Sequence, residues 1–235
     1  MGEGGVSEVE RPAGLPPAVA VMAKLPGLEP AKSRLHPAVP HEMAALLARC
    51  FLLDRLDGVA SLAGITPVFA FSPPWAGAQA AALAPPSFRL MPQRGADLGE
   101  RMSCALADLL AAGHAGALVV GTDSPTLPMA HVGEGAQALE RGAADVVVGP
   151  AEDGGYYLIG LRRAHPALFS GIPWSTGHVM AHTVARAEDL GLRVHLLPTW
   201  FDVDTASDLR RLREDLAAGR AVPRRTARCL AALSI

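Results

Sequence analysis

The chain has 235 residues, half of them apolar, and a formal net charge of −2 at neutral pH. This length and composition favour one large α/β domain. The charge argues against a nucleic-acid binder or a protein of anionic membrane surfaces, because both classes usually carry a net basic surface. The longest stretch without a charged residue, 58–88, is interrupted by prolines, so no membrane-spanning helix is expected.

The termini and cysteines suggest a simple layout. Cys50, Cys104 and Cys229 are widely spaced, which fits neither a disulfide framework nor a thiolate metal site, so a reducing cytoplasm is the expected location. Residues 1–17 are rich in Gly, Glu and Pro and lack the pattern of a secretory signal, which predicts a disordered leader. A single domain is expected from residue 18 to residue 218.

The first expected element is a buried strand at residues 19–23, followed by a loop at residues 24–35 that contains prolines and a glycine. This segment, the first loop, carries three cations, Lys24, Lys32 and Arg34. Several cations in a loop after a strand suit the oxygens of phosphate groups. The simpler interpretation of the loop alone is a solvated basic surface.

The next elements follow from apolar spacing and turn residues. They are a helix at 41–56, a strand at 67–71, an alanine-rich helix near 76–83 and a strand at 88–91. A polar loop then leads into a helix that ends near residue 112, with Asp97 as its expected N-cap. Gln93 could read a nucleobase because its amide both donates and accepts, and Gly95 would let the base approach the backbone. Ordinary turn residues are the alternative for both.

The central strand is expected at residues 117–120, where an apolar run stops at Gly121 and a carboxylate, Asp123, follows. The carboxyl edge of an open parallel sheet is where ligands bind. Asp123 is therefore a candidate metal ligand. The alternative is a turn aspartate that caps its own bend.

A helix at 129–141 and a strand at 145–149 come next. The segment Asp153-Gly154-Gly155-Tyr156 follows, and its glycines permit a positive φ or a close approach of ligand to backbone. It is also a typical hairpin turn joining two strands. Both interpretations can hold together.

A helix is expected to start at Ser175 or Thr176, as N-cap, and to run to residue 190 before a last strand at 194–197. His178 and His182 lie four residues apart on it, a spacing that can bind metal. Without a third ligand nearby, surface or packing histidines are the preferred interpretation.

The last expected helix reaches about residue 218. Thr205 is its expected N-cap, with Asp208 as the acidic member of a capping box. Asp204 could then complete a magnesium site with Asp123 if folding brings them together, or serve as an alternative cap. Residues 219–235 are interpreted as a peripheral helix or a subunit contact, which is compatible with a homodimer.

Taken together, these motifs resemble the glycosyltransferase-A-like nucleotide-diphospho-sugar transferase superfamily, from about residue 19 to residue 216. The best match within it is a bacterial group labelled as arsenosugar-biosynthesis or radical-SAM-associated glycosyltransferases, and the chain is also similar to 2-phospho-L-lactate guanylyltransferase. The residues that carry the resemblance are Lys24, Pro26, Lys32-Ser33-Arg34-Leu35, Gln93, Asp97-Leu98-Gly99-Glu100-Arg101-Met102, Gly121-Thr122-Asp123-Ser124-Pro125, Gly149-Pro150, Asp153-Gly154-Gly155-Tyr156-Tyr157, Trp174-Ser175-Thr176 and Asp202-Val203-Asp204-Thr205.

The resemblance implies a three-layer α/β/α sandwich around a mixed, mostly parallel, Rossmann-like sheet. It also implies that Asp123 and Asp204 share a divalent cation, Mg²⁺ or Mn²⁺. The first loop, with Lys24, Lys32, Ser33 and Arg34, would hold the nucleotide phosphates. The region from Gln93 through Gly95 to Gly99 would lie near the base.

The leading hypothesis is transfer of a nucleotidyl group from an NTP to a small acceptor bearing a phosphate, phosphonate or carboxylate. A triphosphate needs more cationic compensation than a nucleotide-sugar diphosphate, and Lys24, Lys32 and Arg34 could provide it together with the metal. Asp153 and Tyr156, with the glycines between them, would border the acceptor. The alternatives are glycosyl transfer from a nucleotide sugar and a nucleotide-binding regulatory module without turnover.

Overall fold

A computed structural model describes residues 14–29, 32, 35, 39–219 and 223–232 of the chain. Its strands form one seven-stranded sheet in the order β3-β2-β1-β4-β6-β5-β7. The strands are β1 (Ala18–Lys24), β2 (Thr66–Ser72), β3 (Arg89–Pro92), β4 (Ala117–Val120), β5 (Val146–Pro150), β6 (Tyr156–Leu161) and β7 (Val194–Leu196). Only β6 runs antiparallel to its neighbours among these strands. The predicted mixed, mostly parallel sheet is confirmed.

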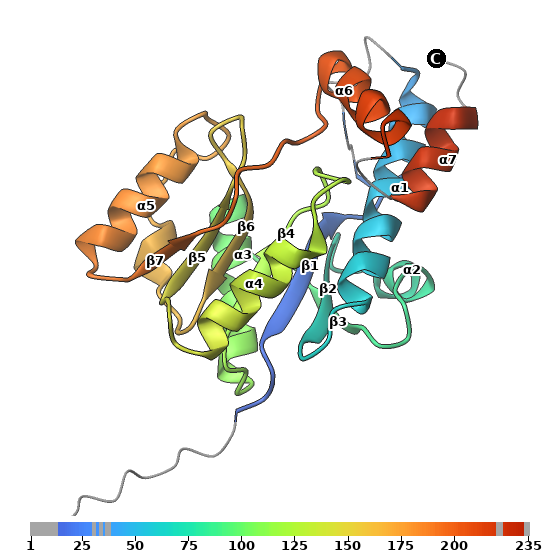
Figure 1. Ribbon diagram of the computed structural model, residues 1–235. Coiled ribbons are helices and arrows are strands. Elements are labelled where there is room, and N and C mark those ends of the chain that lie inside the picture. The colour runs from blue at the N-terminus through green and yellow to red at the C-terminus, as the bar shows by residue number, and fades with distance from the viewer. Residues whose placement is uncertain (1–13, 30–31, 33–34, 36–38, 220–222, 233–235) are drawn as a thin grey trace, which may run out of the picture.

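Helices cover both faces of the sheet and complete the three layers (Figure 1). They are α1 (His41–Ala60), α2 (Gly77–Leu83), α3 (Leu98–Ala111), α4 (Met129–Glu140), α5 (Val179–Asp189), α6 (Ala206–Ala217) and α7 (Arg224–Ala232). Side chains alternate along β1: Val19 and Val21 pack toward α1 and α4, whereas Ala18 and Ala20 pack toward α3. The sheet is therefore buried on both faces, which explains its near-continuous apolar strands.

A third apolar cluster joins the C-terminal helices α6 and α7 to α1. Leu47 and Phe51 of α1 pack there with residues of α6 and α7 and with Phe201 and Val203. The predicted end of α1 at residue 56 is four residues too early, because Gly58 continues the helix where it packs against α4. A Cβ at Gly58 would lie 2.8 Å from the sulfur of Met129.

Two predicted helix caps are confirmed and one is wrong. Asp97 caps α3 by accepting from Glu100 N at 2.8 Å, and Thr205 and Asp208 form the capping box of α6. The predicted start at Ser175 or Thr176 is wrong, because α5 begins at Val179. The chain at Ser175 has φ +64, outside the helical region.

The reason for the late start of α5 is a close tertiary contact. Gly154, in the turn between β5 and β6, has φ +87, and a Cβ there would lie 2.0 Å from the carbonyl oxygen of Gly177. Its own carbonyl accepts a hydrogen bond from Met180 N at 2.9 Å. This contact holds residues 174–178 outside the helix.

The ends of the chain are described only in part. The predicted leader lies outside the described residues as far as residue 13, and Leu15 already pairs with His114 just before β1. The predicted C-terminal segment contains α7, which packs on α1. None of the helices in the described ranges is long and apolar enough to cross a membrane.

Candidate functional site

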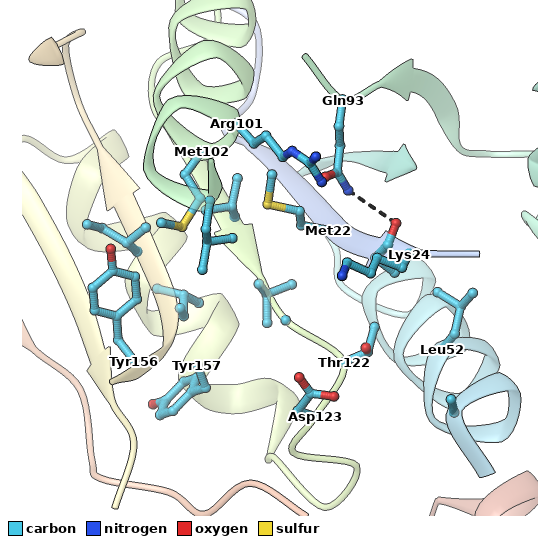
Figure 2. Close-up of a pocket in the computed structure, with 18 of the residues that line it drawn as sticks. Met22, Lys24, Leu52, Gln93, Arg101, Met102, Thr122, Asp123, Tyr156 and Tyr157 are labelled. Carbon is cyan, nitrogen blue, oxygen red and sulfur yellow. Dashed lines mark hydrogen bonds between the residues drawn. The ribbon is translucent and has the colours of Figure 1, made fainter. Parts of the chain in front are cut away.

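A cleft of about 620 Å³ opens at the carboxyl ends of β1 and β4. Its walls come from the end of β1, the first loop, the start of α3 and the loop after β4 (Figure 2). Met22 and Met102 form part of its apolar lining, and Lys24, Gln93 and Arg101 lie toward one end. Tyr156 lies at the other end.

Asp123 stands at this edge because β4 ends just before it. Gly121 N donates to Tyr157 O at 2.9 Å, which is the last contact of β4 with its neighbour β6. The backbone of Asp123 is then held from a distant part of the chain, since its carbonyl accepts from Val203 N at 2.8 Å. This bond joins the loop after β4 to the segment that precedes α6.

The carboxylates of Asp123 and Asp204 meet at one cation, the ammonium group of Lys32. Lys32 Nζ lies 2.5 Å from Asp123 Oδ1 and 2.9 Å from Asp204 Oδ1, and it donates to the Val203 carbonyl at 2.8 Å. Because Thr205 and Asp208 supply the cap of α6, the carboxylate of Asp204 is not needed there. The two acidic residues are therefore brought together, as the sequence predicted.

Lys32 is charged in this position. Its side chain is only 5% exposed, and burial alone would lower the pKa of its amine. The adjacent carboxylates of Asp123 and Asp204 act in the opposite direction and raise the pKa above its usual value. Three oxygens thus surround a full positive charge at the edge of the cleft.

Two further ionisable side chains, Arg55 and Asp202, lie behind this group, and neither was predicted to belong to the site. Arg55 of α1 is 3% exposed and donates through Nη2 to the carbonyl of Ser124, whose hydroxyl donates to Asp202. Burial raises the pKa of Asp202 to about 6, with Asp123 adding to the effect and the Ser124 bond opposing it. Burial lowers the pKa of Arg55 to about 10, against the attraction of Asp202.

Only some of the residues predicted to hold the nucleotide can be placed in the cleft. Lys24, Lys32 and Gln93 line the cleft, whereas Ser33 and Arg34 lie outside the described residues. The amide nitrogen of Gln93 donates to the carbonyls of Ala23, at 3.1 Å, and Ala70, at 2.8 Å. Its donor capacity is filled by the backbone, so only its oxygen is left to read a base.

The two glycines predicted near the base do not line this cleft. Gly95 borders a smaller neighbouring hollow of about 300 Å³, and its φ of +133 explains why glycine is needed there. Gly99 is buried under the indole of Trp174, where a Cβ would lie 2.3 Å from the ring. Arg101, which had no predicted role, lines both hollows, and its side chain extends toward Gln93 (Figure 2).

The predicted acceptor segment forms the hairpin turn between β5 and β6. Asp153 Oδ1 accepts from Gly155 N at 2.9 Å, and neither Asp153 nor the two glycines that follow it line the cleft. Tyr156 does line it. Burial raises the pKa of the Tyr156 hydroxyl, which lies near Thr183 of α5. The structure thus offers the ring of Tyr156, rather than its hydroxyl, to a ligand.

Metal ligation rests on few side chains. Across the described ranges, no three His, Cys, Asp or Glu residues are grouped so as to hold a metal ion. His178 and His182 are both exposed, in agreement with their interpretation as surface histidines. A cation in the cleft would therefore be held by Asp123, Asp204 and groups that a substrate brings.

A family model described as "Uncharacterized protein conserved in bacteria" (DUF2064) matches residues 55–176. A crystal structure from Desulfovibrio desulfuricans G20, provisionally described as a nucleotide-diphospho-sugar transferase, is 33% identical, covers 91% of this chain and 93% of that chain, and has a TM-score of 0.82. No curated protein matches the sequence significantly.

More distant structures share the fold. CMP:2-keto-3-deoxy-manno-octonic acid synthetase complexed with CTP is 14% identical and covers 87% of this chain and 99% of that chain, with a TM-score of 0.53. A 4-diphosphocytidyl-2C-methyl-D-erythritol synthase from Anaerococcus prevotii DSM 20548 is 10% identical and covers 85% of this chain and 96% of that chain, with a TM-score of 0.56. These neighbours confirm the nucleotide-diphospho-sugar transferase fold that the motifs predicted.

Proposed function

The chain belongs to the DUF2064 family of bacterial proteins, and from this premise we propose that it is a nucleotidyltransferase. It moves NMP from an NTP to a small acceptor that bears a phosphate, phosphonate or carboxylate, and it releases pyrophosphate. The fold supports a nucleotide-using transferase, since its structural neighbours include a nucleotide-sugar transferase and a synthetase complexed with CTP.

The observation that carries the proposal is the convergence of Asp123 and Asp204 on one cation. They belong to separate loops, and both lie within 2.9 Å of Lys32 Nζ at the rim of a cleft large enough for a nucleotide. An ion pair that only stabilises the fold would not have to lie at the rim of a cleft. Two carboxylates at the carboxyl edge of the sheet fit a cation that binds substrate phosphates.

The residues present fit a divalent cation, Mg²⁺ or Mn²⁺. Lys32 shows that these oxygens accept a cation, and carboxylate and carbonyl oxygens are the ligands that Mg²⁺ prefers, usually completed by substrate phosphates. When bound, the metal would neutralise phosphate charge and act as a Lewis acid on the reacting phosphorus.

The chain's own cations orient the triphosphate. Lys24 lies exposed in the cleft, and Lys32 of the same first loop lines it as well, which supports a role for both in contacting phosphate oxygens. We include Arg34 of this loop in the same role. An acceptor oxygen forms a bond to the α-phosphorus while the bond to the β-phosphate oxygen breaks, and the cations stabilise the charge on the leaving pyrophosphate. Tyr156, which lines the cleft, would border the acceptor, whereas Asp153 lies outside that lining.

Glycosyl transfer from a nucleotide sugar is the second candidate. It is favoured by the 33% identity to the Desulfovibrio protein, which covers 91% of this chain. The same two carboxylates would then hold the cation that stabilises a departing nucleoside diphosphate. A regulatory module that binds nucleotide without turnover is the third candidate. The presence of both Asp123 and Asp204 at the cleft disfavours it.

One assay separates the three. The protein is incubated with each NTP or nucleotide sugar, Mg²⁺ and a panel of phosphate, phosphonate and carboxylate acceptors, and the products are followed. Release of pyrophosphate that requires an acceptor supports nucleotidyl transfer. Release of UDP or GDP from nucleotide sugars alone overturns it in favour of glycosyl transfer, and binding without product supports the regulatory module. Asp57→Asn, which removes a carboxylate that pairs with Arg225 and does not line the cleft, is the matched control for Asp123→Asn.

A further inference from the structure

Lys32 occupies the oxygens that the proposed metal would use. We propose that its ammonium group is an internal competitor of the divalent cation, so that the metal site forms only when Lys32 leaves Asp123 and Asp204. The inference rests on the proposed function, because it concerns the same two carboxylates. It adds a regulation of that site, in which the metal-free protein holds its own cation in place.

The two cations exclude one another for geometric and electrostatic reasons. Lys32 Nζ contacts one oxygen of each carboxylate and the Val203 carbonyl, all within 2.9 Å. A divalent ion on the same oxygens would lie within a few ångströms of the ammonium group. The repulsion between these two cations makes it unfavourable for both to bind at once. Metal binding therefore requires the lysine side chain to move.

The ammonium group of Lys32 is held by contacts that a ligand could replace. The ammonium is also 5.5 Å from the centre of the Phe51 ring, a contact available to a cation. A ligand that offers the ammonium other oxygens, such as the phosphates of a nucleotide, would free the two carboxylates.

The composition of the chain makes this testable, because Lys24 and Lys32 are its only two lysines. Both contribute to the lining of the same cleft, but Lys24 is exposed whereas the Lys32 side chain is 5% exposed. Lys24→Gln thus removes the same charge from the cleft without vacating the two carboxylates. It is the matched control for Lys32→Gln.

The first experiment measures Mn²⁺ binding without nucleotide, from the electron paramagnetic resonance signal of the free ion. If Lys32 covers the carboxylates in more than nine of ten molecules, its removal should tighten Mn²⁺ binding at least tenfold, by roughly the inverse of the competent fraction. Lys24→Gln should change it less than about threefold. Equal or weaker Mn²⁺ binding by a folded Lys32→Gln variant, judged by circular dichroism, would overturn the inference.

The second experiment uses the unaltered protein and does not depend on a variant that folds. Lysine amines are modified by a small amine-reactive reagent, and the rates at the two lysines are compared by mass spectrometry. Without metal, Lys32 should react at least tenfold more slowly than Lys24, and saturating Mn²⁺ should remove most of that protection. Lys32 that stays protected while Mn²⁺ is bound would overturn the inference.

The outcomes also separate this inference from the proposed function. If Asp123→Asn abolishes Mn²⁺ binding but Lys32→Gln does not tighten it, the competition is wrong and the metal-dependent transferase stands. If Lys32→Gln tightens Mn²⁺ binding but no NTP yields pyrophosphate, the competition stands and nucleotidyl transfer is wrong.

Discussion

At the scale of single residues, the site depends on how charges are paired. Asp123 and Asp204 face the cleft with side chains that are 54% and 33% exposed, whereas Lys32 is nearly buried between them. Exposed carboxylates can exchange one cation for another at little cost to the fold. A buried lysine cannot lose its partners so cheaply.

Asp123→Asn tests this directly. The variant keeps an oxygen for Lys32 and leaves Asp204 as its second carboxylate. We therefore expect a loss in the free energy of unfolding smaller than the roughly 3–5 kcal/mol that follows when a buried charge loses its partner altogether. Metal-dependent transfer should fall by about 100-fold or more, because a charged group at the reacting centre is lost. Urea unfolding and product formation at fixed Mg²⁺ measure the two effects. Activity equal to that of the unaltered protein would remove Asp123 from the mechanism.

Behind the site, Arg55 and Asp202 are connected through Ser124, whose carbonyl accepts from Arg55 and whose hydroxyl donates to Asp202. Arg55→Met leaves the buried carbonyl of Ser124 without its donor and removes a charge that Asp202 attracts, so it should cost about 1–3 kcal/mol of unfolding free energy. Adding Asp202→Asn, which keeps an acceptor for Ser124, should restore a substantial part of that loss. Urea unfolding of both single variants and the double variant measures the coupling. Losses that simply add would show that the two residues do not interact.

At the scale of elements, α7 depends on a cap that another helix supplies. Asp54 of α1 accepts from Arg225 N at 3.0 Å and from Thr226 N at 2.8 Å, which satisfies two donors at the start of α7. We expect Asp54→Ala to cost about 1–2 kcal/mol, as for the loss of an N-cap. Hydrogen exchange in residues 224–232 should accelerate with it.

The control for this prediction is Asp57→Ala, which removes only a surface ion pair with the Arg225 side chain. That change should cost less than about 1 kcal/mol. Equal losses in the two variants would mean that the side-chain pair, rather than the cap, holds α7 on α1.

The ion pair between Asp145 and Arg193, at the edge of the sheet, should make the stability of the fold depend on pH. The bidentate hydrogen bonds from the Arg193 side chain lower the pKa of Asp145 from 3.8 to about 2 and join the start of β5 to the segment before β7. Because the folded-state pKa is depressed, this contribution to stability is present above about pH 4 and is lost as the pH falls toward 2. Asp145→Asn should be less stable than the parent by under about 1 kcal/mol at pH 7.

The measurement is urea unfolding of Asp145→Asn and the parent protein between pH 7 and pH 3. The difference between them should be constant down to about pH 4 and then shrink. A difference that is unchanged at pH 3 would show that Asp145 acts through its shape rather than its charge.

At the scale of the whole molecule, the fold joins two parts. One is the sheet, at whose edge the cleft opens, and the other is the pair of C-terminal helices, α6 and α7, which Asp204 precedes. The segment after β7 passes along the carboxyl edge of the sheet before α6 begins (Figure 1). Val203 N bonds to the carbonyl of Asp123 on the way, and Val203 itself is buried in the cluster with α1 and α7. These two contacts of Val203 hold the neighbouring residue, Asp204, at the cleft.

Much of this fold follows from local patterns. The apolar run of β4 and the capping box at Thr205 were predicted correctly, because each depends on neighbours within a few residues. The start of α5 was not, because the contact of Gly154 with Gly177 is tertiary. The prediction that Asp123 and Asp204 share a cation came from the likeness of the motifs to a known superfamily rather than from their spacing.

The contacts of the site were beyond local reasoning. No sequence pattern distinguishes Lys32, which pairs with the two carboxylates, from Lys24, which lies exposed in the same loop. The burial of Arg55 and its place beside Asp202 likewise appear only when α1 packs on the loop after β4. Asp202 was part of the motif Asp202-Val203-Asp204-Thr205, but only Asp204 of that motif was predicted to belong to the site.

The central claim is that Asp123 and Asp204 together hold one divalent cation. Titration of the protein with Mn²⁺, read from the resonance signal of the free ion, tests it most directly. The account predicts one Mn²⁺ per chain for the unaltered protein and for Asp57→Asn, and binding weakened by at least tenfold in both Asp123→Asn and Asp204→Asn, as expected when a charged ligand is removed. Undiminished Mn²⁺ binding in either of these two variants would contradict it.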